Sequence, residues 1–387
     1  MSQKTERSAD KTPGSMGFRM PAEWESHEAT WIGWPHNRTD WPGKFSTIPW
    51  VYAEIVRKLT LGEIVRIIVD SKTHEAQARR VLSWSGVDLA RVEFFRFPTN
   101  RGWTRDFGPI FVKRDSGQKS EVRGQTSEVG GQRSEVRSPE IAIVRFRFNA
   151  WAKYEDWKRD NRVAKRAARA IDVRLFRAQL EKTDVVLEGG AIEVNGRGTL
   201  IATEECLLDK NMQTRNPDIS REDIETVFRE YLGATNVLWL GRGIEGDDTH
   251  GHVDDLCRFV NTTTVVICRE ENAADYNHAV LEENLDRLRS MTLENGSRLD
   301  VVPLPMPAPL MFRGQRLPAS YANFYIGNSA VLVPTFNDPN DRVALGLLSE
   351  LITDRPVVGI HAVDLVWGLG TLHCLTQQQP RAEPETE

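Results

Sequence analysis

Runs of β-branched and aromatic residues recur along the chain and alternate with segments that suit helices. Residues 63–69 and 92–97 are rich in Val, Ile and Phe, which is typical of β-strands. Residues 73–84 and 273–291 instead predict helices. Strand pairs followed by single helices recur about five times, which predicts an α/β protein of repeated ββαβ units: two strands, a helix and a further strand.

The remaining segments follow the same alternation. Further strands are predicted at 110–112, 141–148, 184–190, 191–194, 199–203, 236–240, 256–260, 264–268 and 357–360. Further helices are predicted at 52–59, 156–171, from 220 onward and at 341–351, with a hairpin over 321–334. Polar loops recur at strand ends, which predicts that they surround one central site.

Three segments differ in kind from this alternation. Ser-Glu-Val recurs at 120, 127 and 134 within residues 116–139, a segment rich in Gly, Gln, Arg and Ser. One apolar position per repeat cannot form a coiled-coil seam, so this segment is predicted to be a solvated, low-complexity loop insert between two strands. Residues 1–18 and 381–387 are predicted to be disordered tails.

Composition limits the classes of function. The 387-residue chain is 40% hydrophobic and 27% charged, with a net charge of −5. This balance suits a globular protein with a sizeable core and gives no electrostatic case for binding nucleic acid or a membrane surface. The N-terminal stretch has no apolar segment typical of a secretion signal. The four cysteines are scattered without a Cys-x-x-Cys pair, which predicts free thiols in a reducing cytoplasm.

Aromatic residues cluster near the start of the predicted domain. Trp24, Trp31, Trp34 and Trp41 lie within a short span. They suit either core packing or an aromatic wall for a flat cationic ligand, and the sequence leaves both interpretations open.

Four polar segments carry groups capable of chemistry. They contain Asp106 (after Arg105), Glu188, the pair His252 and Asp254, and Cys374 on a glycine-rich loop. Together they supply a thiol, an imidazole and three carboxylates. On an extended segment, His252 and Asp254 would face the same side. Each segment also has a plainer interpretation, since lone cysteines are often buried apolar groups and an Arg-Asp pair often lies in a surface turn.

A metal site is the main rival interpretation of the histidine loop. His250, His252, Asp254 and Asp255 are close in sequence, but only alternate residues of an extended segment share a face. A third strong nitrogen or sulfur ligand has no clear source in the sequence. We therefore expect no catalytic metal.

Several carboxylates and one thiol suit a planar cation. A guanidinium presents N–H donors in a fixed fork that carboxylates accept in pairs, which leaves its carbon open to a soft nucleophile. A free thiol has a pKa near ~8.5 and needs a nearby positive charge to ionise at neutral pH. The substrate cation or a protonated His252 would supply that charge.

Seven motifs in order carry a family resemblance. They are Met20-Pro-Ala-Glu-Trp-Glu25, Thr104-Arg-Asp-Phe-Gly-Pro109, Glu188-Gly-Gly190, Thr203-Glu-Glu-Cys-Leu-Leu208, Arg215-Asn-Pro217, Gly251-His-Val-Asp254 and His373-Cys-Leu-Thr-Gln-Gln378. Together they resemble the agmatine deiminases, which belong to the guanidine-modifying enzymes that include bacterial peptidylarginine deiminases. The resemblance covers residues 20 to 380.

The resemblance implies a fold and a reaction. The fold would be a five-bladed α/β propeller (pentein), as one catalytic domain over residues 19–380. Cys374 would attack the guanidinium carbon of agmatine to form a covalent amidino-cysteine, and His252 would protonate the departing ammonia and then activate water. N-carbamoylputrescine and ammonia would be the products. Deimination of free or peptidyl arginine is the alternative, and a non-catalytic binding protein and a metal hydrolase are more distant ones.

The resemblance also implies further residue roles. Asp106 and Asp254 would grip the guanidinium, and Glu188 would orient His252 or the substrate. Asp248 and Trp103 would contact the substrate elsewhere. The implied partner is a small cationic guanidine, no metal or organic cofactor is implied, and the resemblance leaves homo-oligomerisation open. One departure lies beside the nucleophile: the family loop often reads Gly-Gly-Gly-Asn-Ile-His-Cys, whereas residues 368–374 read Gly-Leu-Gly-Thr-Leu-His-Cys.

Overall fold

Five sheets of three or four strands form the framework of the protein. A computed structural model describes residues 11–115 and 140–382, so the insert predicted at 116–139 lies outside the described residues. The sheet orders are β20-β1-β2-β3, β4-β5-β6, β9-β10-β11, β12-β13-β14 and β17-β18-β19. Each sheet contains an antiparallel pair followed by a parallel pair, so one local topology recurs five times.

The strands match most of the predicted positions. Their bounds are β1 His27–Gly33, β2 Ile64–Val69, β3 Val92–Arg96, β4 Ile110–Arg114, β5 Glu140–Arg145, β6 Arg174–Arg177, β9 Glu193–Val194, β10 Thr199–Thr203, β11 Asn236–Leu240, β12 Cys257–Phe259, β13 Thr264–Arg269, β14 Asp300–Pro305, β17 Tyr325–Ile326, β18 Val331–Thr335, β19 Val357–His361 and β20 Thr376–Pro380. Two short ribbons add β7 Gln179–Leu180 with β8 Thr183–Asp184, and β15 Met311–Phe312 with β16 Gln315–Arg316.

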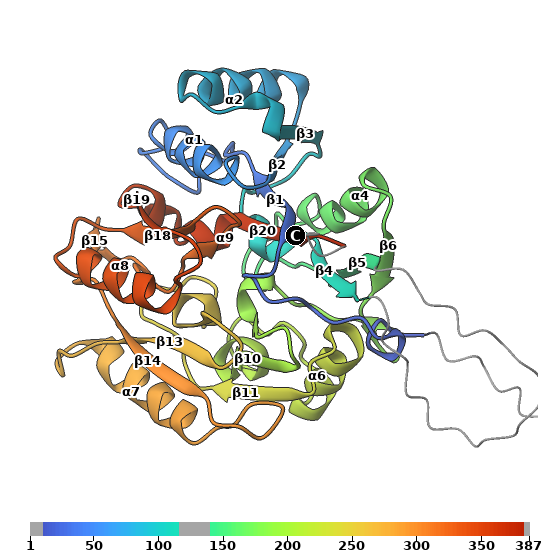
Figure 1. Ribbon diagram of the computed structural model, residues 1–387, viewed down its shortest axis with the longest axis vertical. Coiled ribbons are helices and arrows are strands. Elements are labelled where there is room, and N and C mark those ends of the chain that lie inside the picture. Colours follow the sequence, from blue (N-terminus) through green and yellow to red (C-terminus); the bar gives the residue numbers. More distant parts are fainter. Residues whose placement is uncertain (1–10, 116–139, 383–387) are drawn as a thin grey trace, which may run out of the picture.

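A helix connects the parallel strands of each sheet. These helices are α1 Ile48–Leu59, α2 Lys72–Trp84, α4 Val163–Ala170, α6 Arg221–Val227, α7 Tyr276–Arg289 and α8 Asn340–Leu351. Figure 1 shows them at the periphery, while the chain runs from blue at the top through green and yellow to red at the left. The predicted succession of two strands, a helix and a strand is therefore confirmed in outline.

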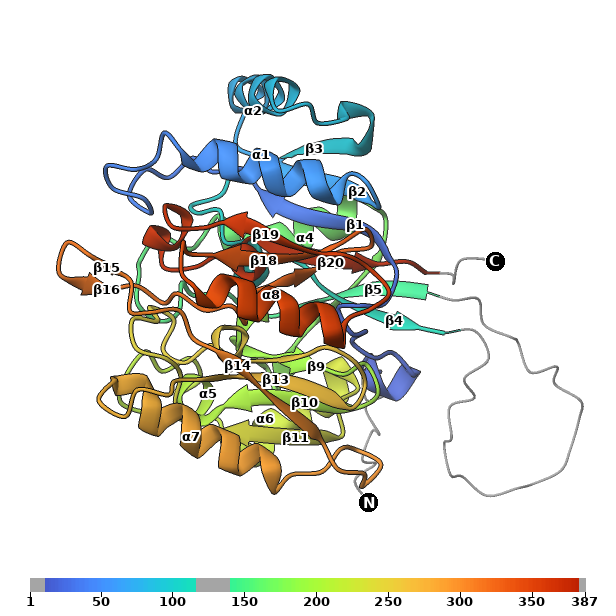
Figure 2. The same ribbon diagram turned by 60° about the vertical axis from the view of Figure 1, so that its left-hand side comes forward.

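The last strand joins the first, which brings the two ends of the fold together. β20 pairs with β1 in antiparallel register, with Gln377 opposite Trp31 (Figure 2). The indole of Trp31 donates to Gln379 Oε1 at 2.9 Å. This pairing places the residues just before β20 at the centre of the molecule rather than at a free end.

The N-terminal tryptophans belong to the core. Trp31, Trp34 and Trp41 are buried, and Trp24 is half-buried against the same apolar cluster. The core-packing interpretation of these side chains is therefore confirmed for the three buried ones. Their packing against helix α1 residues such as Tyr52 anchors the first sheet.

Several predicted segments take a different form. Residues 11–18 of the predicted tail carry a 3-10 helix, Gly14–Met16, and Phe18 is buried against Phe176, since an apolar ring gains by leaving water. Only residues 160–170 of the helix predicted at 156–171 are helical, as a 3-10 turn that continues into α4. None of the helices in the described ranges is long and apolar enough to cross a membrane.

Candidate active site

A polar residue stands just before the first strand of every sheet. Helix α3 (Thr104–Phe107) precedes β4, the 3-10 turn η4 (Gly189–Ala191) precedes β9, and the 3-10 turn η6 (Val253–Asp255) precedes β12. Helix α9 (Leu372–Leu375) precedes β20, and Asn323 precedes β17. Helix α3 contacts both α9 and η4, and η4 contacts η6. The recurring topology therefore brings five separate turns together.

Cys374 lies in α9 and is almost fully buried. Asn323 Nδ2 lies 3.1 Å from the sulfur, and Asp254 Oδ2 lies 3.8 Å from it. Burial raises the pKa of the thiol well above its ordinary value, and the negative charges of Asp254 and Asp106 add to this effect. The thiol is therefore neutral until a cation enters the site.

His252 stands between three carboxylates. Its Nδ1 lies 3.8 Å from Asp106 Oδ1 and 4.0 Å from Asp254 Oδ1, and its Nε2 lies 3.8 Å from Glu188 Oε2. Burial opposes the charged ring, but Asp106, Cys206 and Glu188 outweigh it, so the pKa of His252 is raised well above its ordinary value. The imidazole thus holds a proton that it can donate at neutral pH.

Asp106 is held by an indole on a strained turn. Trp151 Nε1 donates to Asp106 Oδ2 at 2.8 Å, and the backbone N–H of Gly190 donates to Oδ1 at 3.2 Å. Ala150, Trp151 and Ala152 all have a positive φ, of 53°, 58° and 53°, a conformation that costs free energy for residues with a side chain. Burial raises the pKa of Asp106 to about 6. The three strained residues thus form the turn that directs the indole of Trp151 toward the carboxylate of Asp106.

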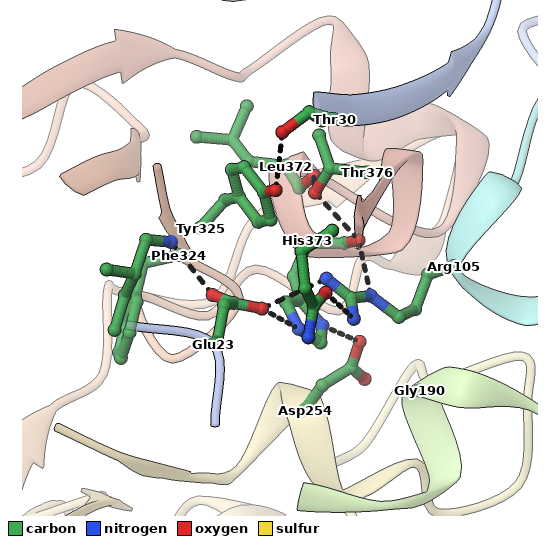
Figure 3. A network of polar contacts seen from close by, with 12 residues as sticks. Glu23, Thr30, Arg105, Gly190, Asp254, Phe324, Tyr325, Leu372, His373 and Thr376 are labelled. Carbon is green, nitrogen blue, oxygen red and sulfur yellow. Dashed lines mark hydrogen bonds and ion pairs between the residues drawn. The ribbon is translucent and has the colours of Figure 1, made fainter. Parts of the chain in front are cut away.

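A chain of buried ionic groups fixes one oxygen of Asp254. His373 Nδ1 lies 2.6 Å from Asp254 Oδ2, and His373 Nε2 lies 2.9 Å from Glu23 Oε2 (Figure 3). Arg105 Nη2 donates to the same oxygen of Glu23 at 3.0 Å. Burial opposes the ionised form of Asp254, but the bond to His373 outweighs it and lowers its pKa. Asp254 Oδ1 is buried and makes no hydrogen bond to any of the described residues, so it is available to a ligand.

Glu188 is kept ionised by a buried arginine. Arg215 Nε donates to Glu188 Oε1 at 3.2 Å, and both side chains are fully buried. Burial alone would raise the pKa of Glu188, but Arg215 and His252 outweigh it and lower the pKa to about 2. Glu188 therefore presents a constant negative charge to His252.

A cavity of about 210 Å³ leads from the surface to Cys374. Its walls include the aromatic side chains of Trp103, Trp151 and Tyr154 and the carboxylates of Asp40, Asp106 and Asp248. Asp248 accepts a hydrogen bond from Tyr154 Oη at 2.7 Å and pairs with Lys153. Trp24, Trp31 and Trp34 do not line this cavity, so the aromatic wall comes from other tryptophans.

Two backbone features shape the site closely. A Cβ on Gly190 would lie 2.6 Å from His252 Nδ1 and 2.9 Å from Asp106 Oδ1, so only glycine fits between them. Leu369 has φ 67°, where L-residues with a side chain are strained, and it lines the cavity. This is the position at which the loop departs from the glycine of the resembled family.

The structure brings together all seven residues singled out from the sequence, but by a different local geometry at three of them. His252 and Asp254 lie at a 3-10 turn rather than on an extended strand, and Cys374 lies in a short helix followed by a strand rather than in a loop. Arg105 is not a surface partner of Asp106, because it is buried and bonded to Glu23 and Gln378.

Other residues of the site were not identified from the sequence. Trp151, Asn323 and His373 each contact a predicted residue, Cys206 places its sulfur within 4.8 Å of ligand atoms of Glu188 and His252, and Glu23 contacts His373. Glu23, Cys206 and His373 fall within the quoted motifs, which was the only signal for them. Trp151 and Asn323 carried none.

Comparison with known proteins gives a consistent result. The model of the Porphyromonas-type peptidyl-arginine deiminase family matches residues 19–380. The agmatine deiminase of Medicago truncatula is 36% identical over 397 residues, which cover 96% of this chain and 98% of the relative. The agmatine deiminase of Pseudomonas aeruginosa strain LESB58 is 33% identical over 393 residues, which cover 95% and 97%. The solved agmatine deiminase of Enterococcus faecalis superposes with a TM-score of 0.83 at 30% identity, covering 98% and 100%.

Proposed function

This chain belongs to the Porphyromonas-type peptidyl-arginine deiminase family, and we propose that it is an agmatine deiminase that hydrolyses agmatine to N-carbamoylputrescine and ammonia. One observation carries the proposal: Cys374 and Asp106 line a cavity walled by carboxylates, and directly beside them lie an imidazole with a raised pKa, that of His252, and the unbonded Oδ1 of Asp254. Such a cavity suits a small cation, and a guanidinium most of all.

Binding of the substrate activates the nucleophile. The guanidinium occupies the space between Asp106 and Asp254, and its charge offsets the carboxylates that raise the pKa of Cys374. The thiol then loses its proton to solvent, and the sulfur attacks the guanidinium carbon. His252 donates its proton to the departing nitrogen, so that ammonia leaves and an amidino-cysteine remains.

The second half of the reaction reverses the role of the imidazole. Neutral His252 takes a proton from water, and the resulting hydroxide adds to the amidino-cysteine carbon. The carbon–sulfur bond then breaks, which releases N-carbamoylputrescine and returns the thiol. Glu188, kept ionised by Arg215, holds the ring in place and stabilises its charged form.

The walls of the cavity favour agmatine over arginine. Asp40 and Asp248 flank it, and its one arginine, Arg101, is already paired with Asp40 at 2.7 Å and with Asp156 at 3.1 Å. The α-carboxylate of arginine would therefore meet the like charge of Asp248, which costs several kcal/mol. We expect kcat/KM for agmatine to exceed that for arginine and for an arginyl peptide by at least ~100-fold, measured as ammonia release from the three substrates in parallel. Equal turnover of arginine would contradict the substrate assignment.

A single substitution of Asp248 tests how much the carboxylates of the cavity wall contribute to agmatine binding. In Asp248→Asn, we expect KM for agmatine to rise about 10-fold with kcat unchanged, because a charge far from the reacting carbon contributes uniform binding. Asp156→Asn is the matched control, since it removes a more exposed carboxylate that pairs with Arg101 but does not line the cavity. A fall in kcat for Asp248→Asn would place that residue at the chemistry instead.

The pH profile reports on Asp106. Its pKa is about 6, and the guanidinium needs the ionised carboxylate, so kcat/KM should fall as the pH drops through about 6. The Trp151 indole favours the ionised form by donating to Asp106 Oδ2. In Trp151→Phe, the lost charge-assisted bond should therefore move this acid limb to higher pH by roughly 1 unit. An unmoved limb would show that another group controls it.

We also propose the finer architecture and setting of the protein. The five sheets of one topology, arranged in succession around the molecule and closed by the pairing of β20 with β1, support a five-bladed α/β propeller (pentein) as one catalytic domain over 19–380. Four free cysteines and a thiol nucleophile support a reducing cytoplasm. A homo-oligomer is a further proposal, for which light scattering on the purified protein is the test.

A further inference from the structure

A second thiol lies close to His252 and forms no bond to the substrate in the reaction above. Cys206 belongs to helix α5 (Glu204–Leu208) and is buried. Ligand atoms of Glu188, Cys206 and His252 all lie within 4.8 Å of one another, and all three residues are buried. The sequence offered no third strong ligand beside the histidine loop, and the fold supplies one from a different sheet.

We propose that Glu188, Cys206 and His252 form a binding site for a thiophilic divalent cation, with Zn²⁺ as the representative ion, and that occupation of this site inhibits the enzyme. The inhibitory part rests on the proposed function, whereas the binding site does not. The ion is a reversible inhibitor and is not needed for turnover.

The donor set and its spacing suit this class of ion. A thiolate, an imidazole and a carboxylate are the three protein ligands that zinc most often takes. Bonds of about 2.0–2.3 Å in a tetrahedron place ligand atoms roughly 3.3–3.8 Å apart. The separation of 3.8 Å between His252 Nε2 and Glu188 Oε2 lies at the upper end of this range.

His252 Nε2 is the second observation that points to a ligand. This nitrogen is buried and makes no hydrogen bond, although buried polar atoms are nearly always bonded. Its ring is turned so that Nδ1 faces Asp106 and Asp254, while Nε2 faces Glu188. A metal ion that displaces the Nε2 proton and takes its lone pair would supply the missing interaction.

The thiol is held in place by its own helix. Thr203 caps α5, and its Oγ1 accepts a hydrogen bond from the backbone N–H of Cys206 at 3.1 Å. The hydroxyl of Thr203 in turn donates to the carbonyl of Gly251, the residue before His252. The segments that carry the thiol and the imidazole are thus tied together by one threonine.

Binding replaces two protons by the metal. The S–H bond of Cys206 and the Nε2–H bond of the protonated His252 break and both protons pass to solvent, while sulfur–metal and nitrogen–metal bonds form, so affinity should rise with pH. The metal also takes the lone pair of His252 Nε2, which must be free or protonated for His252 to transfer protons. Occupation therefore blocks both the release of ammonia and the activation of water.

A rival metal position exists and must be removed from the test. Asp254, Asp255 and Cys374 also place ligand atoms within 4.8 Å of one another. The only soft ligand in that group is the sulfur of Cys374, which is also the nucleophile. A metal ion bound there would inhibit as well, so an inhibition measurement alone cannot tell the two positions apart. The variant Cys374→Ala eliminates its sulfur and leaves Cys206 as the only thiol next to a histidine of the site.

The direct test uses Co²⁺ as a spectroscopic substitute for Zn²⁺. Cobalt titrated into the Cys374→Ala protein should produce a thiolate-to-cobalt charge-transfer band that saturates at one ion per chain. The double variant Cys374→Ala/Cys206→Ser should lose this band, because an oxygen ligand gives none, while circular dichroism shows the same fold. Absence of the band in the single variant, or its persistence in the double variant, would overturn the site. Neither arm depends on turnover.

The inhibitory role has its own readout. Zn²⁺ should inhibit ammonia release by the wild-type protein, and a chelator should restore it. In Cys206→Ser, measured against its own uninhibited rate, the Zn²⁺ concentration for half inhibition should rise at least ~10-fold, the loss of one strong ligand. An unchanged value would assign the inhibition to Cys374 and overturn this part. A wild-type protein without turnover on any guanidine would count against the proposed function and leave the cobalt result intact.

Discussion

Replacing Cys374 with Ala should abolish ammonia release from agmatine while the protein stays folded. The reaction proposed here needs a covalent bond from the sulfur to the guanidinium carbon, and no other thiol reaches the cavity. Loss of a nucleophile in such a mechanism lowers kcat by roughly 10⁴-fold or more. The measurement is ammonia release at saturating agmatine, with circular dichroism of the variant as a check of the fold.

The variant should still bind the substrate. Asp106 and Asp254, which are proposed to hold the guanidinium, are unchanged in this variant and keep their negative charges. Agmatine at 100 times its Kd should therefore stabilise Cys374→Ala against thermal unfolding by about 2.7 kcal/mol. Cys257→Ala is the matched control, because Cys257 is an equally buried thiol in β12 that does not line the cavity. Near-wild-type activity of Cys374→Ala would refute the covalent mechanism.

In the wild type, the covalent intermediate itself is a second observable. Mixing with agmatine and quenching with acid should leave a fraction of the protein heavier by the mass of agmatine less one ammonia. Digestion should place the added mass on the peptide that contains Cys374. An adduct on another cysteine would identify that residue as the nucleophile. Inactivity of Cys374→Ala alone would not reveal this.

The repeated topology could be predicted because each unit carries its own local signals. Runs such as Ile64–Val69 and Thr264–Arg269 are β-branched enough to identify strands, and the helices between them have suitable lengths. Helix ends were less certain, since α1 begins at Ile48, four residues before the predicted start, with Pro49 in its first turn. The pairing of β20 with β1 joins opposite ends of the sequence, and no local pattern signals it.

The residues of the candidate site likewise divide into those that a local sequence pattern identifies and those that it does not. Asp106, Glu188, His252 and Cys374 lie in short motifs, so sequence alone could single them out. The contact of Glu23 with His373 spans 350 positions, and that of His373 with Asp254 spans 119. Only the closed fold brings such partners together, which is why the support of Asp254 and the thiol of Cys206 beside His252 were not predicted.

Asp254→Asn should cause the second large loss. The carboxylate has one oxygen bonded to His373 and the other free for the guanidinium, whereas an amide has only one acceptor for these two donors. Removing one partner of a buried ion pair costs about 3–5 kcal/mol, so kcat/KM should fall roughly 10³-fold. Steady-state ammonia release over a range of agmatine concentrations measures this.

Asp255→Asn is a matched control at the next residue. Burial, together with Asp254 and Asp247, raises the pKa of Asp255 well above its ordinary value, so its side chain is a neutral acid. It accepts a hydrogen bond from Asn323 Nδ2 at 3.0 Å, and an amide oxygen can accept the same bond. The same substitution should therefore lower kcat/KM by less than ~10-fold at this position. Equal losses at 254 and 255 would point to disturbed packing of the turn rather than to a lost guanidinium partner.

In Asp254→Asn, the chemical reactivity of the Cys374 thiol should increase while the rate of catalysis falls. After burial, Asp254 is the foremost charge that raises the pKa of Cys374, so its removal lowers that pKa and increases the thiolate fraction of the free protein. Alkylation of Cys374 by iodoacetamide without substrate should thus become faster, although turnover becomes slower. A variant in which both rates fall would be one whose cavity has collapsed. Slower turnover with a more reactive thiol is the combination expected if Asp254 binds the cation that activates the sulfur.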